Sequence, residues 1–489
     1  MPGMTMLDEE TQTEGAWEPI TPPAGYTPEA PGASQGFDGA LIADILPPAL
    51  SEDGLALEFS RQYAEDWRYV HAWGRWLSWD GTVWRREKTR RIINLIKGTC
   101  RDVDARHPKA DGKTRGVKWK TICAVEKMAQ ADPRHDCSDD IWDRDPWALN
   151  TPKGIIDLKT GEVRPNDPTE LMTQTASASM GDDCPRWVQF LQEITDGDDD
   201  LAQYLARVAG YILTGVTTEH ALFFIYGTGR NGKGKFIATL AAIMGDYFTG
   251  LPLDALMETK TQQHTTDLAG LRNARMVSSD EIDKGRRWAK AKVSAMTGGG
   301  NITARLMRQD NTTFRGKFKL IISGNNKPAI NDVDEAIRSR MHLIPFTVKF
   351  LGNAQDKELE SKLLAERDGI LAWAVQGCLD WQQAGLRPPE SVVAATKDYL
   401  ESEDSIGRWI LECCQVEKSA RETGKKLFDS WRGWAELSGE NFGNIKRFTA
   451  DLEKREFRKF QERAGNVFFG LCVRGSVVQE HFALNDENA

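Results

Sequence analysis

One short segment constrains the fold of this chain more than any other. Residues 221–236 read Ala-Leu-Phe-Phe-Ile-Tyr-Gly-Thr-Gly-Arg-Asn-Gly-Lys-Gly-Lys-Phe. The apolar run 221–226 predicts a buried strand, the glycines after it predict a loop, and 236–244 predicts a helix. Such a loop lets backbone N–H groups approach a polyphosphate, whose negative charge the helix N-terminus stabilises. The segment therefore predicts an α/β fold with a phosphate-binding loop, and a glycine-rich turn that binds nothing is the alternative.

The loop supplies the candidate nucleotide-binding residues. They are Gly227, Gly229, Arg230, Asn231, Gly232, Lys233 and Gly234. We expect Lys233 to act as a solvent-facing point charge that reaches the outer phosphates. The Ser or Thr that usually follows this lysine and holds Mg²⁺ is absent, because position 234 is glycine.

Acidic side chains follow a second predicted strand, about forty residues after the loop. The segment 274–279 predicts a short strand, which leads directly into Asp280, Glu281 and Asp283. A nucleotide hydrolase needs such carboxylates to hold Mg²⁺ and to orient or deprotonate the attacking water. Acids after a strand are common and by themselves weak evidence. The prediction of a catalytic role rests on their spacing from the glycine-rich loop.

Two more predicted strands bring an amide and two arginines. The strand 318–323 precedes Asn325, whose amide could sense the γ-phosphate, although an Asx turn before a proline explains it equally well. Arg338 and Arg340 precede an apolar strand, and an arginine here could reach the γ-phosphate bound by a neighbouring subunit.

Charge along the chain is uneven. The 489 residues carry a net charge of −9, which does not indicate nucleic-acid binding. Yet 286–319 holds nine Lys or Arg and one acid, and 85–120 holds thirteen Lys or Arg and four acids. Basic surfaces of this kind can bind phosphate backbones, and a solvated helix face is the alternative. No apolar run reaches membrane-span length, and the eight cysteines are scattered, so we expect a cytoplasmic protein with reduced thiols.

The chain divides into five predicted regions. A hairpin is expected at 73–84 with Asp80-Gly81 as its turn, and the tryptophans around it are expected in a core rather than on a base-stacking platform. The regions are a flexible leader (1–50), a Trp-rich α+β domain (51–180), a helical collar with the nucleotide-binding core (181–355), a helical lid (356–390) and a winged-helix-like domain (391–489).

The order of these motifs resembles the superfamily three (AAA+) helicase core of the phage and plasmid primase–helicase family, whose relatives include poxvirus replication proteins. The shared features are the loop, the acids, the Thr297–Arg305 segment, the Gly-Asn-x-Lys-Pro strand end and the Arg-x-Arg closure. The Trp-Ala-Leu-Asn-Thr-Pro-Lys-Gly-Ile-Ile-Asp-Leu segment is similar to the domain that precedes the helicase in that family. The match extends over roughly 70–480.

The resemblance implies a role for each matching residue. Lys233 would be the Walker A lysine, Glu281 the main Walker B acid with Asp280 and Asp283 beside it, and Asn325 the sensor. Arg340 would be the arginine finger, with Arg338 as second choice. Arg305, Arg308 and Lys292 would contact DNA, the first two on a hairpin at 304–314 that projects into a ring channel.

The family implies an ATP-dependent DNA helicase or translocase of phage or plasmid replication. ATP and Mg²⁺ would be its ligands, with the metal held by water and carboxylates because of Gly234. Six copies would surround single-stranded DNA with 3′→5′ polarity, and a separate primase or polymerase is a further candidate partner. Two alternatives stay open: a DNA-stimulated ATPase that loads or remodels a replication complex without unwinding, and a non-enzymatic origin-binding protein.

Overall fold

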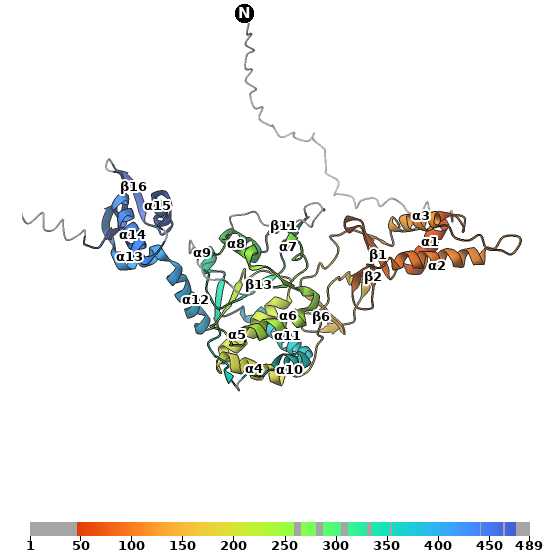
Figure 1. The fold of residues 1–489 in the computed structure, drawn as a ribbon, viewed down its shortest axis with the longest axis horizontal. Coiled ribbons are helices and arrows are strands. Elements are labelled where there is room, and N and C mark those ends of the chain that lie inside the picture. The colour runs from red at the N-terminus through yellow and green to blue at the C-terminus, as the bar shows by residue number, and fades with distance from the viewer. Residues whose placement is uncertain are drawn as a thin grey trace, which may run out of the picture.

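The computed structural model describes residues 46–258, 266–279, 287–304, 312–328, 330, 335–352, 355–440, 442–462 and 465–475. Figure 1 shows an N-terminal helical and sheet region and a C-terminal region at opposite ends of a central α/β body. No helix among the described residues has the length and apolarity that crossing a membrane requires.

The N-terminal region packs three helices against a four-stranded sheet in the order β3-β2-β1-β4. Its elements are α1 (Glu52–Tyr63), β1 (Trp67–Val70), β2 (Arg75–Trp79), β3 (Trp84–Arg86), α2 (Arg91–Arg106), α3 (Trp119–Gln130) and β4 (Asp136–Cys137). The predicted hairpin is present, since β2 and β3 pair antiparallel with Trp79 opposite Trp84. Trp67, Trp76 and Trp84 are buried, as a core role requires.

A small antiparallel sheet connects this region to the central body. It consists of β5 (Ala148–Thr151), β6 (Gly154–Asp157) and β7 (Val163–Arg164). Asn150 is fully buried here and donates hydrogen bonds to the carbonyls of Thr82 and Gln174, at 2.9 and 3.1 Å. The amide therefore ties the hairpin turn to the segment that leads into the core.

The central body is built on a five-stranded sheet whose neighbours all pair parallel, in the order β14-β8-β13-β10-β9. The strands are β8 (Leu222–Tyr226), β9 (Phe248–Gly250), β10 (Met276–Ser279), β13 (Lys319–Gly324) and β14 (Met341–Pro345). This confirms the predicted α/β class, and the pairing shows that the sheet is parallel. The order puts β8, the strand before the glycine-rich loop, between β14 and β13.

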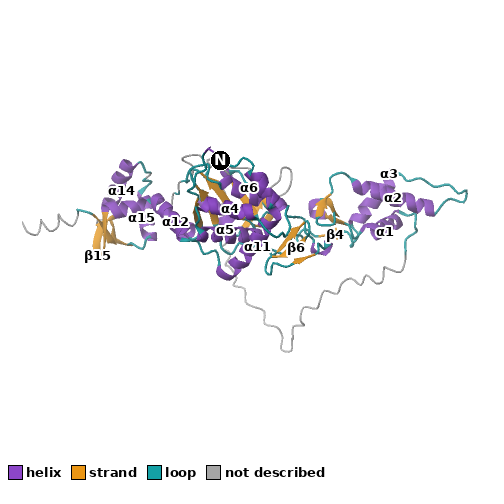
Figure 2. Ribbon diagram, turned by 90° about the horizontal axis from the view of Figure 1, so that it is seen from below, coloured by secondary structure: helices purple, strands orange, loops and turns teal. Residues whose placement is uncertain are grey.

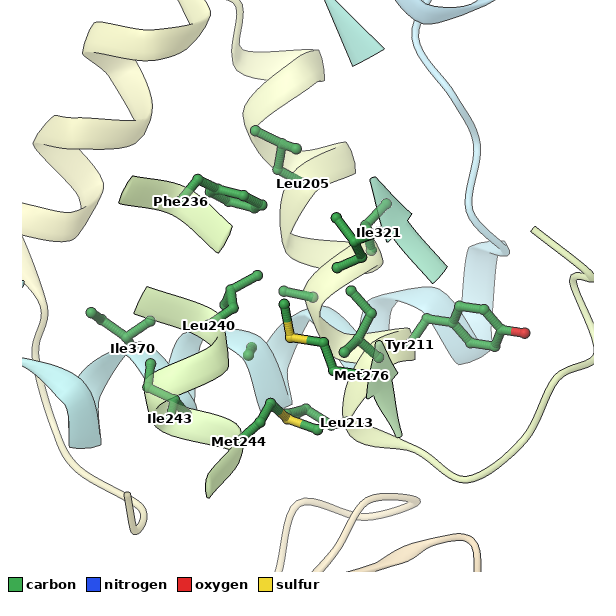
Figure 3. Close-up of a cluster of buried hydrophobic side chains, with 14 of the residues drawn as sticks. Leu205, Tyr211, Leu213, Phe236, Leu240, Ile243, Met244, Met276, Ile321 and Ile370 are labelled. Atoms are coloured by element: carbon green, nitrogen blue, oxygen red, sulfur yellow. The ribbon is translucent and has the colours of Figure 1, made fainter. Parts of the chain in front are cut away.

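Both faces of the sheet are covered, which explains why β8 is a continuous apolar run. Phe223 and Ile225 face one hydrophobic cluster, and Leu222 and Phe224 face another. Figure 3 shows part of the first cluster, where α6 presents Phe236, Leu240 and Ile243 toward side chains of the neighbouring helices and strands.

Helices and short strands complete the central body, with several helices gathered beside the sheet (Figure 2). They are α4 (Pro185–Thr195), α5 (Asp199–Leu213), α6 (Lys233–Met244), α7 (Thr266–Ala269), α8 (Lys290–Thr297), α9 (Glu335–Arg338), α10 (Leu359–Ala365) and α11 (Arg367–Ala384). A hairpin of β11 (Asn301–Ala304) and β12 (Thr312–Arg315) pairs antiparallel beside the sheet. Helix α6 begins at Lys233 and contains the predicted helical stretch 236–244.

Helix α12 (Glu390–Glu403) lies within the predicted C-terminal region but packs on the core. Its Tyr399 and Leu400 belong to the second core cluster. The Thr396 hydroxyl accepts a hydrogen bond from the Leu343 N–H of β14 at 2.9 Å. The separate C-terminal core therefore starts with the next helix.

That C-terminal core consists of α13 (Ser405–Cys413), β15 (Cys414–Thr423), α14 (Gly424–Ser438), α15 (Ile445–Lys454), β16 (Arg458–Glu462) and β17 (Gly465–Val473). The three strands form an antiparallel sheet in the order β15-β17-β16. Asp404, the N-cap of α13, contacts arginines on both of its sides: Arg338 of α9 at 3.6 Å and Arg455 after α15.

The packing of α5 against α11 yields a stability prediction. An added Cβ at Gly210 would lie 2.0 Å from the Cys378 backbone nitrogen, so the two helices touch through their backbones. We expect Gly210→Ala to lower the free energy of unfolding by about 1–3 kcal/mol, because overpacking forces the helices apart. Denaturant titration measures this change. Gly433→Ala in α14 is the matched control, since its Cβ would meet no atom within 4 Å, and it should be neutral or stabilising by up to about 1 kcal/mol. Equal stability of the two variants would refute the close contact.

Candidate nucleotide site

The site lies where the carboxyl ends of β8 and β13 meet. In the parallel register Tyr226 pairs with Gly324, so the loop after β8 and the turn after β13 leave the sheet side by side. Ligands of open parallel sheets bind at such an edge. Asn325 and the glycine-rich loop, which are about ninety residues apart in sequence, are thereby brought into contact.

The loop conformation depends on its glycines. Gly229 and Gly232 have φ of +94° and +85°, values that side chains disfavour. A Cβ at Gly227 would lie 1.8 Å from Asn231 Nδ2, so any side chain would displace that amide. Asn231 Nδ2 donates to the Phe346 carbonyl at 3.0 Å, which anchors the loop to the end of β14.

Lys233 is the first residue of α6, and its position differs from the prediction. The side chain is only 7% exposed, so the expectation of a solvent-facing lysine is wrong. Its ammonium donates to the Gly227 carbonyl at 2.7 Å and to the side-chain oxygens of Asn231 and Asn325, both at 3.0 Å. These oxygens satisfy the buried charge and fix it at the carboxyl edge of the sheet.

A cavity of about 880 Å³ opens in front of this lysine. The loop and the first turn of α6 form one wall, and the ends of β10 and β13 form another. Arg230 and Lys235 add positive charge, while Ile237, Ala241 and Phe248 give an apolar side. A cationic end beside an apolar wall suits a phosphorylated ligand that also carries a ring system.

Sequence reasoning missed two hydroxyls that line this cavity, Ser278 of β10 and Ser323 of β13. Each stands near the carboxyl end of a predicted strand, which is the only signal that the sequence offers for them. Hydroxyl and amide oxygens are acceptable to Mg²⁺, but the ion usually needs one or two carboxylates and substrate phosphates as well. Within the described ranges no group of three or more His, Cys, Asp or Glu could hold a metal ion.

Five predicted site residues lie outside the described residues. They are Asp280, Glu281, Asp283, Arg305 and Arg308. The fit of the site to Mg²⁺ therefore depends on the acids that follow β10 directly in sequence.

Lys292, the third predicted DNA contact, is described. It lies on α8 half-buried, and its ammonium donates to the Met257 carbonyl at 3.3 Å. This contact turns the head group of Lys292 toward the interior of its own subunit.

Both candidate arginines lie near the amino ends of the parallel strands, whereas the loop lies at their carboxyl ends. Arg340 precedes β14, whose first residue pairs with Leu222 at the start of β8. The loop follows the other end of β8, so the five residues of β14 separate the two by about 17 Å. Arg340 Nη1 donates to the Ala336 carbonyl at 2.8 Å, and Arg338 contacts Asp404. Neither is assembled with Lys233 within one chain.

Comparison with known proteins places this site in a family context. Residues 56–196 match the family described as D5 N terminal like, and residues 225–340 match a family of unknown function, DUF5906. A protein named "Putative helicase L207/L206" of Acanthamoeba polyphaga mimivirus is 23% identical over 321 residues, 60% of this chain and 33% of that protein. "Putative helicase 022R" of Frog virus 3 is 23% identical over 51% of this chain and 28% of its own length.

These matches confirm the predicted resemblance to the primase–helicase family. The matched segment spans a third or less of each of these viral relatives. Among solved structures, the apo NrS-1 C-terminal region (305–718) aligns with 85% of this chain and 98% of its own, at 9% identity and a TM-score of 0.47.

The buried lysine gives the first prediction at this site. Lys233→Ala should lower ATP hydrolysis at least about 100-fold, because it removes the fixed charge that would face the phosphates. Since three oxygens also lose their donor, we expect a lower unfolding temperature as well. Steady-state hydrolysis and a thermal melt of the same preparation measure both. Undiminished turnover in the folded variant would remove Lys233 from the site.

The open space at position 234 gives the second prediction at this site. A Cβ on Gly234 would meet no atom within 4 Å, so a larger residue fits on this first turn of α6. Gly234→Ser should lower the Mg²⁺ concentration that half-saturates hydrolysis severalfold, because it adds a hydroxyl ligand of the usual kind. Gly234→Ala is the control, since it fills the same space without an oxygen. An identical Mg²⁺ dependence of the two variants would contradict the idea.

Proposed function

We propose that this protein is an ATP-dependent DNA helicase or translocase that acts as a ring, in replication of a phage or plasmid genome. The observation that carries the proposal is the buried Lys233 ammonium, fixed beside Asn325 at the mouth of a cavity of about 880 Å³. The helicase names of the viral relatives and the D5 N-terminal-like match support the same class.

In this proposal the chain's own residues position ATP. The backbone of 227–232 and Lys233 hold the phosphates, and the Asn325 amide, already hydrogen-bonded to that lysine, orients the water or the γ-phosphate. Asp280 and Glu281, with Asp283, are proposed to hold Mg²⁺, which when bound would neutralise charge that develops on the phosphates. The strand order supports an AAA+ core, because the loop strand β8 lies between β13, which ends just before Asn325, and β14, which begins just after Arg340.

The position of Arg340 favours action between subunits. At about 17 Å from the loop of its own chain, its guanidinium cannot touch the γ-phosphate bound there. A head-to-tail ring joins one surface of each subunit to a different surface of the next. It can therefore bring Arg340 of one subunit to the glycine-rich loop of its neighbour. Arg338 is the weaker candidate, since Asp404 already contacts it.

Two further elements would contact DNA. The β11–β12 hairpin has a buried base, with Ile302 opposite Phe314, and is proposed to carry Arg305 and Arg308 into the channel. The helix, strand, helix, helix, strand, strand order of the C-terminal region is typical of a winged helix, which we propose binds DNA or a protein partner.

The decisive experiment measures two activities of the purified chain. Hydrolysis of ATP with Mg²⁺ should rise when single-stranded DNA is added, and a forked duplex should be separated. Stimulated hydrolysis without strand separation would favour a loader or remodeller of replication complexes. Absence of hydrolysis would leave an origin-binding role.

A mixing experiment tests the ring. Arg340→Ala subunits keep an intact loop, and Lys233→Ala subunits keep an intact arginine, so each alone should be inactive. In a ring of equal proportions, about a quarter of the interfaces would combine a good loop with a good arginine. We therefore expect hydrolysis to recover to that order of the wild-type rate. If light scattering shows mixed rings and hydrolysis stays at zero, Arg340 does not act between subunits.

A further inference from the structure

A second cavity, of about 500 Å³, lies where the N-terminal hairpin meets the central body. The end of β3 and the residues after it form one wall, and Asp246 and Asn273 of the central body contribute to the other. Four cationic side chains line it: Arg85, Arg86, Lys88 and Arg91. All four belong to the basic stretch 85–120, to which the proposed helicase core gives no role. We call this cavity the hairpin groove.

The hairpin groove contains two acids, Asp246 and Glu87. Asp246 contacts the Arg85 guanidinium at 2.6 Å, and Glu87 accepts a hydrogen bond from the Thr89 hydroxyl at 2.7 Å. Arg86 and Lys88 have no carboxylate within ion-pair distance among the residues that the structure describes. Four cationic side chains and two carboxylates line the groove, so its net charge is positive even with Glu87 ionised.

Like charges gather around Arg86. Partial desolvation lowers the pKa of this guanidinium, although the residue as a whole is exposed, and the nearby charges of Arg272 and Arg75 lower it further. The guanidiniums of Arg86 and Arg272 both lie over the Trp73 ring, at 5.2 and 5.8 Å from its centre. Holding cations together costs free energy, and a rigid aromatic ring fixes them in one geometry. Arg272 is paired with Asp139 at 3.0 Å, so Arg86 is the member of this group whose charge an anion could neutralise.

The exposed face of α2 extends the same charge. Arg91, Asn94, Gly98 and Arg101 recur at intervals of three and four residues, which puts them on one face of the helix. A Cβ at Gly98 would meet nothing within 4 Å, so packing within the chain does not explain a glycine that costs helix stability of about 1 kcal/mol. Its absent side chain would let an extended ligand approach the helix backbone between the two arginines.

We propose that the hairpin groove and this face of α2 bind the phosphodiester backbone of nucleic acid, outside the ring channel. Arginines and lysines from a hairpin and a helix suit backbone contact along an extended strand. The inference rests on the proposed function in taking nucleic acid as the ligand. It assigns to the N-terminal region the task of holding the strand or the duplex arm next to the core.

The test compares two charge-reversal pairs in the full-length chain without nucleotide. Arg86→Glu with Lys88→Glu alters the groove, and Arg61→Glu with Lys127→Glu makes the same change at exposed positions of α1 and α3. Fluorescence anisotropy with labelled oligo(dT) of about 30 nucleotides, and with a hairpin duplex, gives affinity between about 50 and 200 mM salt. The thermal melts of both pairs confirm folding, and Lys88→Glu alone, at an exposed site, replaces the groove pair if that pair unfolds.

The groove pair should weaken binding roughly tenfold and reduce the slope of log affinity against log salt by about 1.4, or about 0.7 for each lost contact to a single strand. The control pair should stay within about twofold of the wild type. A loss confined to oligo(dT) or to the duplex identifies which form lies in the groove. Equal losses in both pairs, or no loss in the groove pair, would overturn the proposal. If the wild-type chain hydrolyses no ATP but its DNA affinity still depends on Arg86, the proposed helicase function is wrong and the proposed binding of nucleic acid by the hairpin groove stands.

Discussion

The pairing of β8 between β13 and β14 is the constraint on which the rest of the central body depends. Since side chains alternate along a strand, a slip of one residue would move Phe223 and Ile225 to the wrong face of the sheet. It would also separate the loop from Asn325, because the pairing of Tyr226 with Gly324 places the two side by side. The two hydrophobic clusters therefore fix the geometry of the nucleotide site as well as the fold.

Local sequence was sufficient where the physics is local. A continuous apolar run, three glycines and a lysine predict a strand, a loop and a helix, and the structure has them at 222–226 and from Lys233. The Asp80-Gly81 turn likewise predicts the β2–β3 hairpin. Asn325 could be named from its place after a strand, although only the parallel register explains how it reaches Lys233.

Long-range contacts set the limit of such prediction. The burial of Lys233 depends on oxygens of Asn231, Gly227 and Asn325, one of them far away in sequence, so no local pattern indicates it. The packing of α12 on β14 was missed for the same reason, since an amphipathic helix does not say which domain it will cover. The predicted roles of Asp280, Glu281, Asp283, Arg305 and Arg308 stay predictions, because they lie outside the described residues.

Ion pairs of Asp404 connect the central body to the C-terminal region. Its carboxylate is 11% exposed and receives Arg338 from one side and Arg455 from the other, while it also caps α13 by accepting the Gly407 N–H at 2.9 Å. A rotation of the C-terminal region would separate Asp404 from one of these arginines and leave a nearly buried charge half-neutralised, which is costly. The orientation of the C-terminal region is thus coupled to the short α9 segment just before Arg340. A movement of the C-terminal region would therefore displace α9, and a movement of α9 would displace the C-terminal region.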